Sequence, residues 1–256
     1  GYAFARTASD IVVTVDSDTV LDASAIAEGL RPFGDPKVTA VAANVRALNH
    51  RRNLLTRLID MRYANAFLFE RAAYSTVGSV VCCCGSLSFF RTAVVRRHLD
   101  DFLHQSFLGI QVQYGDDRRL TQYALQDGLA RLQDTAVAYT LVPETLGHYR
   151  RQQLRWNRSF FRESLWAIQR FGPRRWPFWI SVAELAVWMM FTISLLAAVY
   201  VRPVLTGQMI PWSFVAFAVV LAYARNVRYF GRPDESLRSQ CATFACAPLY
   251  TVLHVL

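Results

Sequence analysis

The sequence has 256 residues and a formal net charge of +9, with Lys37 as the only lysine among 28 basic residues. Its length suits one large domain, or a medium-sized domain with an appendage, and its arginines fit a nucleotide-type substrate, an anionic membrane surface or nucleic acid. The five cysteines, three of them adjacent at positions 82–84, argue against a disulfide framework and a zinc site, and indicate buried thiols in a reducing compartment.

Residues 1–150 alternate between apolar strands and helices. Residues 1–10 lack the charged and apolar regions of a signal peptide. The chain passes almost at once into an apolar strand, so we expect a fragment whose upstream part lies outside the sequence. Strands are predicted at residues 11–15, 38–42 and 135–141, helices at residues 23–34, 54–73 and 117–128, and an apolar, glycine-containing segment at residues 77–90. This alternation predicts an α/β domain.

Long apolar stretches begin near Trp176. Residues 176–200 contain Glu184 as their single charge, and this length crosses a hydrocarbon core of about 30 Å at about 1.5 Å per residue. A second apolar stretch covers residues 203–224, and residues 240–256 resemble the start of a third. Because arginines flank the outer ends of the first two stretches, the positive-inside rule places residues 1–150 in the cytoplasm. Two helices buried in a large soluble protein are the alternative.

Paired aspartates follow the first apolar strand in the segment "VDSDT". Ligands of an open α/β sheet bind outside the carboxyl ends of its strands, where Asp16 and Asp18 are placed. If the strand geometry continues, alternation directs both carboxylates to the same side. Two like charges this close require a cation or several hydrogen-bond donors, so the motif predicts a divalent metal that bridges to a diphosphate. A turn with two solvated aspartates is the alternative.

A second acidic pair lies in "YGDDRRLTQ". Gly115 permits a tight turn, and a helix begins just after it. A carboxylate is stabilised at a helix N-terminus, so a capping role for Asp116 or Asp117 is one interpretation. One aspartate suffices for a cap, and the other is then a candidate general base for an acceptor hydroxyl.

The third cluster, "YRRQQLRWNRSFFRES", covers residues 149–164. Helical spacing separates an arginine flank from an apolar flank, which is typical of a helix in the membrane interface. That role does not require Gln152, Arg155 and Trp156 in this spacing. An indole can stack on a sugar ring, and an arginine fork can hold a diphosphate or sugar hydroxyls.

In chain order, "VDSDT", "CCCGSLSFFR", "GDDRRLT" and "QQLRW" resemble the motifs of the membrane-embedded, processive family-2 glycosyltransferases. The family includes hyaluronan, chitin, chitooligosaccharide and cellulose synthases, and the resemblance is nearest to hyaluronan synthases, with chitin and chitooligosaccharide synthases close. It implies an α/β, GT-A-type catalytic domain at residues 1–150, with its N-terminal part missing. An amphipathic interface helix at residues 151–175 and a transmembrane region at residues 176–256 follow.

The resemblance also implies a role for each motif. Asp16 and Asp18 would bind Mg²⁺ or Mn²⁺ on the diphosphate of a UDP-sugar. Asp117 would be the catalytic base, with Asp116 beside it. Ser86 stands where the family usually has proline. The remaining substrate-binding positions would be Cys84 and Gly85 in the acceptor segment, and Gln152, Arg155 and Trp156 in the binding floor.

The implied reaction is an inverting transfer of sugar from UDP-GlcNAc, alternating with UDP-GlcA in a hyaluronan synthase, onto a growing polysaccharide extruded across the plasma membrane. The implied enzyme is multi-pass with a cytoplasmic catalytic domain, and its partners are the UDP-sugar, the polysaccharide and the lipid bilayer, but not nucleic acid. Chitin or chitooligosaccharide synthesis is the alternative. A HAD-type phosphohydrolase would use Asp16 as nucleophile and Asp18 as acid/base, but no lysine follows Lys37 to complete its site. An inactive membrane scaffold is a further alternative.

Overall fold

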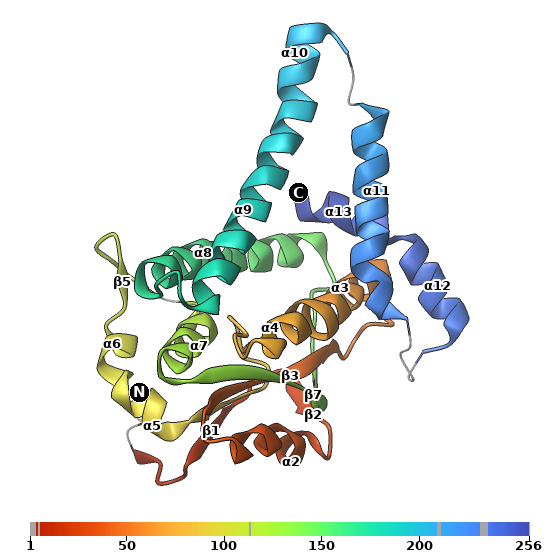
Figure 1. Cartoon of the computed structure of the whole chain (residues 1–256). Helices are drawn as coiled ribbons and strands as arrows, with labels where there is room; N and C mark the ends of the chain where they lie inside the picture. The colour runs from red at the N-terminus through yellow and green to blue at the C-terminus, as the bar shows by residue number, and fades with distance from the viewer. Residues whose placement is uncertain (1–3, 5, 113, 209–210, 231–234, 256) are drawn as a thin grey trace.

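The protein, seen in a computed structural model, has an α/β body from which two apolar helices project (Figure 1). The structure describes residue 4 and residues 6–112, 114–208, 211–230 and 235–255. Five strands form the main sheet in the order β1-β4-β3-β7-β2, and only β3 and β7 pair in parallel. The strands are β1 (Ile11–Thr14), β2 (Thr19–Leu21), β3 (Val38–Ala47), β4 (Ser88–Arg91) and β7 (Leu129–Thr140). The expectation of an α/β fold is confirmed.

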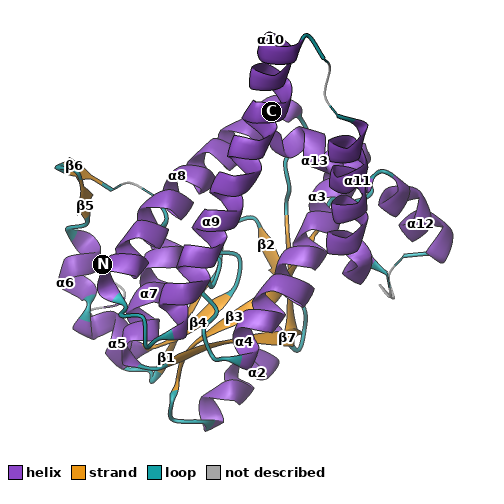
Figure 2. Cartoon of the chain, turned by 45° about the horizontal axis from the view of Figure 1, so that its top comes forward, coloured by secondary structure: helices purple, strands orange, loops and turns teal. Residues whose placement is uncertain are grey.

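Helices cover both faces of this sheet (Figures 1 and 2). One face carries α2 (Ala25–Leu30), which continues into the 3₁₀ turn η1 (Arg31–Gly34). The other face carries α3 (Leu54–Asn65), the π-helical segment η2 (Ala66–Arg71), α4 (Ala72–Thr76), α5 (Thr92–Arg97), α6 (Leu99–Leu103) and α7 (Asp116–Asp127). The predicted helix at residues 54–73 therefore exists, and its start is defined by a capping box between Asn53 and Thr56.

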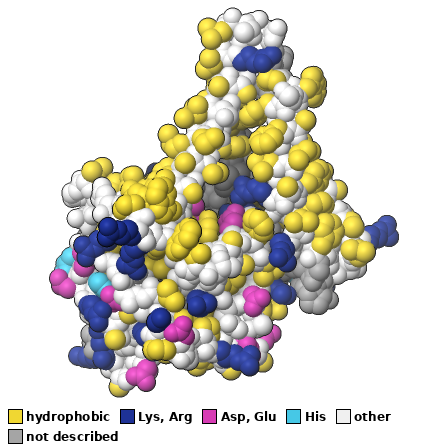
Figure 3. All heavy atoms as spheres, in the orientation of Figure 1, with side chains coloured by type: hydrophobic (Ala, Val, Ile, Leu, Met, Phe, Trp, Pro, Cys, Tyr) yellow, Lys and Arg dark blue, Asp and Glu magenta, His cyan; other side chains and the backbone are white. Residues whose placement is uncertain are grey.

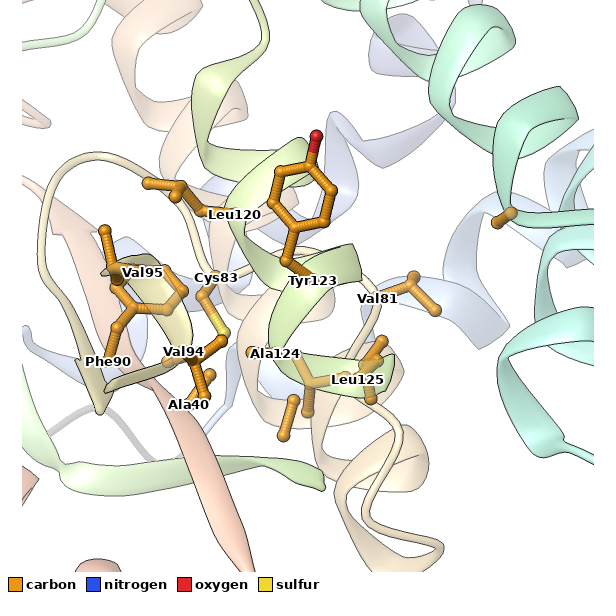
Figure 4. Packing of buried hydrophobic residues seen from close by; sticks show 14 of the residues in the cluster. Ala40, Val81, Cys83, Phe90, Val94, Val95, Leu120, Tyr123, Ala124 and Leu125 are labelled. Atoms are coloured by element: carbon orange, nitrogen blue, oxygen red, sulfur yellow. The ribbon is translucent and has the colours of Figure 1, made fainter. Parts of the chain in front are cut away.

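The core is divided by β3, whose side chains alternate between the two faces of the sheet. Val41 packs in the cluster on the α2 face, and Ala40 and Ala42 pack in the cluster beneath α5 and α7. Figure 4 shows the second cluster, in which Tyr123 and Phe90 are 1 % exposed. This packing holds the start of α7 over the carboxyl end of the sheet.

The predicted interface helix is longer than residues 151–175 at its start and shorter at its end. This helix, α8, spans Leu146–Arg170. It begins early because Thr145 Oγ1 accepts a hydrogen bond from the backbone N–H of His148 at 3.3 Å. It ends before Gly172 and Pro173, because proline cannot continue a helix.

A single helix in the described residues is long and apolar enough to cross a membrane. It runs through Trp176–Thr206; its most apolar 18-residue window has a mean hydropathy of 2.0, and 6 % of that window is buried. Its parts are α9 (Trp176–Leu196), π-helical η3 (Ala197–Val201) and α10 (Arg202–Thr206). The expected end near residue 200 is wrong, because Pro203 sits in the first turn of α10, where the helix needs no proline N–H.

The apolar segments that follow are shorter than the sequence predicts. Residues 203–206 of the expected stretch 203–224 belong to α10. The helix that corresponds to the rest of the stretch is α11, which spans Trp212–Asn226 and leads into η4 (Val227–Tyr229). The expected third stretch divides at Cys246 into α12 (Leu237–Ala245) and α13 (Ala247–Val255). Residues 209–210 and 256 of these two stretches lie outside the described residues. Figure 3 shows hydrophobic side chains over the projecting α9 and α11 and charged side chains over the body below them.

A small β-hairpin precedes the second acidic motif and was not anticipated from the sequence. Its strands are β5 (Ser106–Phe107) and β6 (Ile110–Gln111). The hairpin stands away from the main sheet and lies to the side of α8 (Figures 1 and 2).

Candidate active site

The first acidic pair lies in a turn rather than on a strand. β1 ends at Thr14, and the backbone N–H of Thr19 donates to the carbonyl of Asp16 at 3.1 Å. The alternation assumed for Asp16 and Asp18 is therefore wrong, because the chain reverses between them. Both carboxylates are nevertheless held at this end of the sheet: Ser86 Oγ donates to Asp16 Oδ2 at 3.4 Å, and Thr140 Oγ1 donates to Asp18 Oδ1 at 3.3 Å.

Asp16 is the point at which the separate motifs meet. Desolvation of its carboxyl, followed by repulsion from Asp18 and Asp117, raises its pKa, while the Ser86 hydroxyl and the Arg155 guanidinium lower it. Coulomb interactions weaken with distance, so Asp16 lies near Asp117 at the start of α7 and near Arg155 in the middle of α8. Residues 82–86 also connect the two acidic motifs, because Cys82 donates to Asp117 and Ser86 donates to Asp16. Three carboxylates with one nearby arginine make a site that attracts cations.

Asp117 is held in place by two donors. The backbone N–H of Arg118 donates to its Oδ1 at 2.8 Å, and the Cys82 thiol donates to its Oδ2 at 3.7 Å. Burial, followed by repulsion from Asp117, raises the pKa of Cys82 to about 12, so its thiol remains a neutral donor. Asp117 is half-buried. These two donors fix the orientation of the carboxylate.

The helix cap is Gly115, and neither aspartate takes that position. Asp116 and Asp117 occupy the first turn of α7, where the helix dipole stabilises negative charge. Asp116 is exposed, and desolvation of its carboxyl together with repulsion from Asp117 raises its pKa. Gly115 has a φ of +96°, and a Cβ there would lie 2.2 Å from Ser159 Oγ. The tight turn predicted at Gly115 therefore allows α7 to start directly against α8.

A buried ion-pair cluster joins α7 to α8. Glu163 is fully buried and accepts from Arg119 Nε at 2.6 Å and from Arg162 Nε at 2.7 Å. Arg162 Nη2 also donates to the carbonyl of Tyr114 at 2.6 Å. The same three side chains thus hold α8 against α7 and fix the backbone immediately before Gly115.

Arg155 and Trp156 each lie about one turn after Gln152 on α8, so both neighbour the Gln152 side chain. Arg155 acts on Asp16, as described above. Trp156 is 41 % exposed, so its indole is free to accept a ligand. Gln152 Oε1 is buried and has no hydrogen-bond partner among the described residues. An unpaired buried acceptor is costly and indicates a group that a ligand would satisfy.

The segment at residues 84–86 lies against the Asp16 carboxylate. Ser88 Oγ donates to the Cys84 carbonyl at 2.5 Å, which fixes the start of this segment. A Cβ on Gly85 would lie 2.7 Å from Asp16 Oδ1. The segment therefore has glycine where the carboxylate approaches the backbone.

We expect Gly85→Ala to displace the Asp16 carboxylate while leaving the fold intact. Asp16 can move because it is the end of an exposed side chain, so the free energy of unfolding should change by no more than about 0.5 kcal/mol. The manganese-dependent UDP binding that the family resemblance implies, measured by calorimetry, should weaken. Gly34→Ala is the matched control, because a Cβ there meets nothing within 4 Å. Equal UDP affinity in both variants would contradict the importance of this contact.

Reasoning from the sequence missed several residues of the site. Cys82 was interpreted only as a buried thiol, and Glu163 was not singled out. Glu163 is the only acid in the arginine-rich residues 149–164, and this was the signal that could have identified it. Cys82 offered no comparable signal, because its contact with Asp117 depends on the fold.

The donor set of the first acidic pair fits a hard divalent cation in part. No group of three His, Cys, Asp or Glu side chains that could hold a metal occurs in the parts of the chain that the structure describes. Asp16 and Asp18 would supply two carboxylates, and Mg²⁺ commonly takes its remaining ligands from phosphates and water. The like charges around Asp16 are the feature that such a cation would offset.

Comparisons with known proteins show the family to which the chain is similar. A family model described as "Glycosyltransferase like family 2" matches residues 2–159. A hyaluronan synthase of Streptococcus pyogenes is 37 % identical over 99 % of this chain, and the chain spans 59 % of that relative's length. An N-acetylglucosaminyltransferase of Azorhizobium caulinodans is 42 % identical over 65 % of this chain and 42 % of its own length.

A solved structure shares the fold. The mannosyltransferase PcManGT from Pyrobaculum calidifontis, in complex with GDP-Man and Mn²⁺, superposes with a TM-score of 0.59 and 19 % identity. The match covers 98 % of this chain and 64 % of that structure. The likeness supports a GT-A-like fold.

Proposed function

Because the chain belongs to the family-2 glycosyltransferases, we propose that it is the catalytic and membrane-proximal part of a processive, hyaluronan synthase-like enzyme. It would move sugars from UDP-sugars onto a growing polysaccharide. The observation that carries this proposal is that residues 82–86 contact both acidic motifs, Asp117 through Cys82 and Asp16 through Ser86, while Arg155 of the third motif acts on Asp16.

In the proposed reaction, Asp117 removes the proton from the acceptor hydroxyl. The hydroxyl oxygen attacks the anomeric carbon of the donor as the bond from that carbon to the diphosphate breaks and UDP leaves. Arg118 N–H and the Cys82 thiol orient the Asp117 carboxylate for this step. Asp16 and Asp18 would hold Mg²⁺ or Mn²⁺, which would offset the charge of the nucleotide diphosphate. Inversion at the anomeric carbon follows from a single displacement.

The α8 motif would form the floor of the acceptor site. The exposed Trp156 indole can stack on a sugar ring, and Arg155 can pair with the diphosphate near Asp16. The unpaired Gln152 Oε1 would accept a hydrogen bond from a sugar hydroxyl. These three groups would position the acceptor toward Asp117.

The exposed apolar surface of α9 supports a membrane location. Met190 is 68 % exposed and Val187 is 65 % exposed, and a helix with such residues on its surface is suited to lipid contact. We propose that residues 1–150 lie on the cytoplasmic side of the plasma membrane, because arginines flank the outer ends of α9 and α11. The product would then leave across the bilayer.

Replacing Asp18 by asparagine is expected to weaken UDP binding in the presence of Mn²⁺ by at least about tenfold, since even supporting groups around a metal contribute this much. Calorimetry on the protein in nanodiscs measures the effect. Asp22→Asn is the control, because its carboxylate is exposed and accepts from Ser24 instead. Manganese-dependent UDP binding that survives in Asp18→Asn would refute the metal assignment.

The likeness to an N-acetylglucosaminyltransferase supports a second candidate product, a chitin-type polymer made from UDP-GlcNAc alone. Supplying UDP-GlcNAc with and without UDP-GlcA distinguishes the two candidates. Hyaluronan synthesis requires both donors and gives a product that hyaluronidase degrades, whereas a chitin-type product forms from one donor and is degraded by chitinase.

The phosphohydrolase interpretation is not supported, because the glycosyltransferase family model covers Asp16 and Asp18 themselves. Hydrolysis of p-nitrophenyl phosphate is expected to be absent. An inactive scaffold would show no metal-dependent binding of UDP, so the Asp18→Asn experiment also tests that alternative.

A further inference from the structure

The tip of the β5–β6 hairpin exposes apolar side chains on a strained backbone. Leu108 is 87 % exposed and Ile110 is 72 % exposed. Leu108 has a φ of 52° and is the only non-glycine residue with a positive φ among the described residues. A leucine in this conformation is strained. Because the Leu108 side chain is exposed, packing within the chain does not offset the cost of this strain. The hairpin therefore presents its apolar tip to something other than the described residues.

The position of the hairpin indicates what covers this tip. The hairpin reaches the level of α8, on the side of the body from which α9 projects (Figures 1 and 2). The exposed apolar residues Leu154 and Leu165 lie on α8, and Trp176 and Trp179 lie at the start of α9. Hydrophobic side chains cover α9 and the part of the surface next to its lower end (Figure 3). The tip thus continues the apolar surface of the projecting helices.

The composition and the small size of the hairpin tip favour lipid, rather than a protein partner, as the group that covers it. Residues 105–112, "QSFLGIQV", carry no charge, and glutamine and serine frame the apolar tip. A stable protein interface takes about 800 Å² from each partner, which a tip of three apolar side chains cannot supply by itself. Short apolar segments with polar flanks can instead bury their side chains in the headgroup and acyl boundary of a bilayer.

We propose that the β5–β6 hairpin inserts Leu108 and Ile110 into the lipid interface beside α8. The proposal rests on the membrane location of α9 given above. Val112 N–H donates to the Gln105 carbonyl at 3.0 Å and closes the base of the hairpin, and Gly115 and Asp117 follow shortly after. The anchored hairpin would thus hold Val112, five residues before the proposed base Asp117, at a set height above the bilayer.

Fluorescent labels on single cysteines test this insertion in the full chain, reconstituted as one copy per nanodisc of phosphatidylcholine and phosphatidylglycerol. The background carries Cys241→Ser and Cys246→Ser, and its residual labelling is subtracted. Leu108→Cys and Ile110→Cys report on the hairpin, and the second does not depend on the strained φ. Met190→Cys on α9 and the exposed Ala23→Cys before α2 are the membrane and aqueous references.

Insertion predicts that lipids with a headgroup-proximal nitroxide quench the labels at positions 108 and 110, and that iodide quenches them about tenfold less than the label at position 23. Iodide quenching at 108 and 110 equal to that at 23, with position 190 quenched by nitroxide lipids, overturns the hairpin proposal alone. Labels shielded from iodide but not quenched by nitroxide lipids indicate a protein contact and also overturn it. No nitroxide quenching at position 190 refutes the membrane location itself.

Discussion

Asp117→Asn is expected to abolish polymer formation, with a loss of about 10² to 10⁴ in turnover, the usual contribution of a general base. Asparagine keeps the shape of the side chain and can still meet the Arg118 N–H, but it cannot take a proton from the acceptor hydroxyl. UDP-sugar binding should remain largely intact, because Asp117 acts on the acceptor rather than on the nucleotide. UDP release and polymer yield measure the loss, and calorimetry measures binding.

Asp127→Asn is the matched control for that variant. Asp127 lies at the other end of α7 and pairs with Arg97 at the surface at 2.7 Å, a contact worth about 0 to 1 kcal/mol. Its turnover should stay near that of the unsubstituted protein. Near-normal turnover in Asp117→Asn would show that the base has been wrongly assigned.

Glu163→Gln is expected to destabilise the protein by about 3 to 5 kcal/mol, because removal of one partner leaves buried charge uncompensated. Two arginines, Arg119 and Arg162, lose their carboxylate inside the contact between α7 and α8. The backbone at Tyr114 loses the fixed donor that holds it. We therefore expect both a lower unfolding midpoint and a lower turnover number, with UDP affinity less affected.

Glu144→Gln tests whether this effect belongs to the buried cluster. Glu144 pairs with Arg52 at 3.5 Å, and both side chains are largely exposed, so its substitution should change stability by no more than about 1 kcal/mol. Thermal unfolding of the two variants in the same nanodiscs provides the comparison. Equal midpoints would rule out the buried cluster as the main link between α7 and α8.

Much of the fold was readable from local patterns. The apolar run that begins at Trp176 predicted the projecting helix, and α7 begins at Asp116, within one residue of its expected start. The α/β class followed from short apolar strands alternating with helices. The spacing at residues 151–175 predicted a helix, and α8 spans Leu146–Arg170. Its place at a membrane interface stays a prediction.

Where the prediction failed, backbone geometry beyond the local pattern was responsible. The strand before the first acidic pair stops at Thr14 because a turn follows, and the continuation of α9 through Pro203 depends on where that proline falls in the helix. The β5–β6 hairpin has too few residues for a periodic signal. Short elements are set by turns and by packing rather than by hydrophobic period.

The sequence by itself determined the order and chemical nature of the motifs, the α/β alternation and the apolar helix. Only the tertiary structure decided which side chains meet: Cys82 with Asp117, Arg119 with Glu163, and Asp18 with Thr140. These pairs lie 35, 44 and 122 residues apart in the chain. Local sequence governs the conformation and burial of a segment, whereas contacts over such distances are set by how the packed helices and strands bring their ends together.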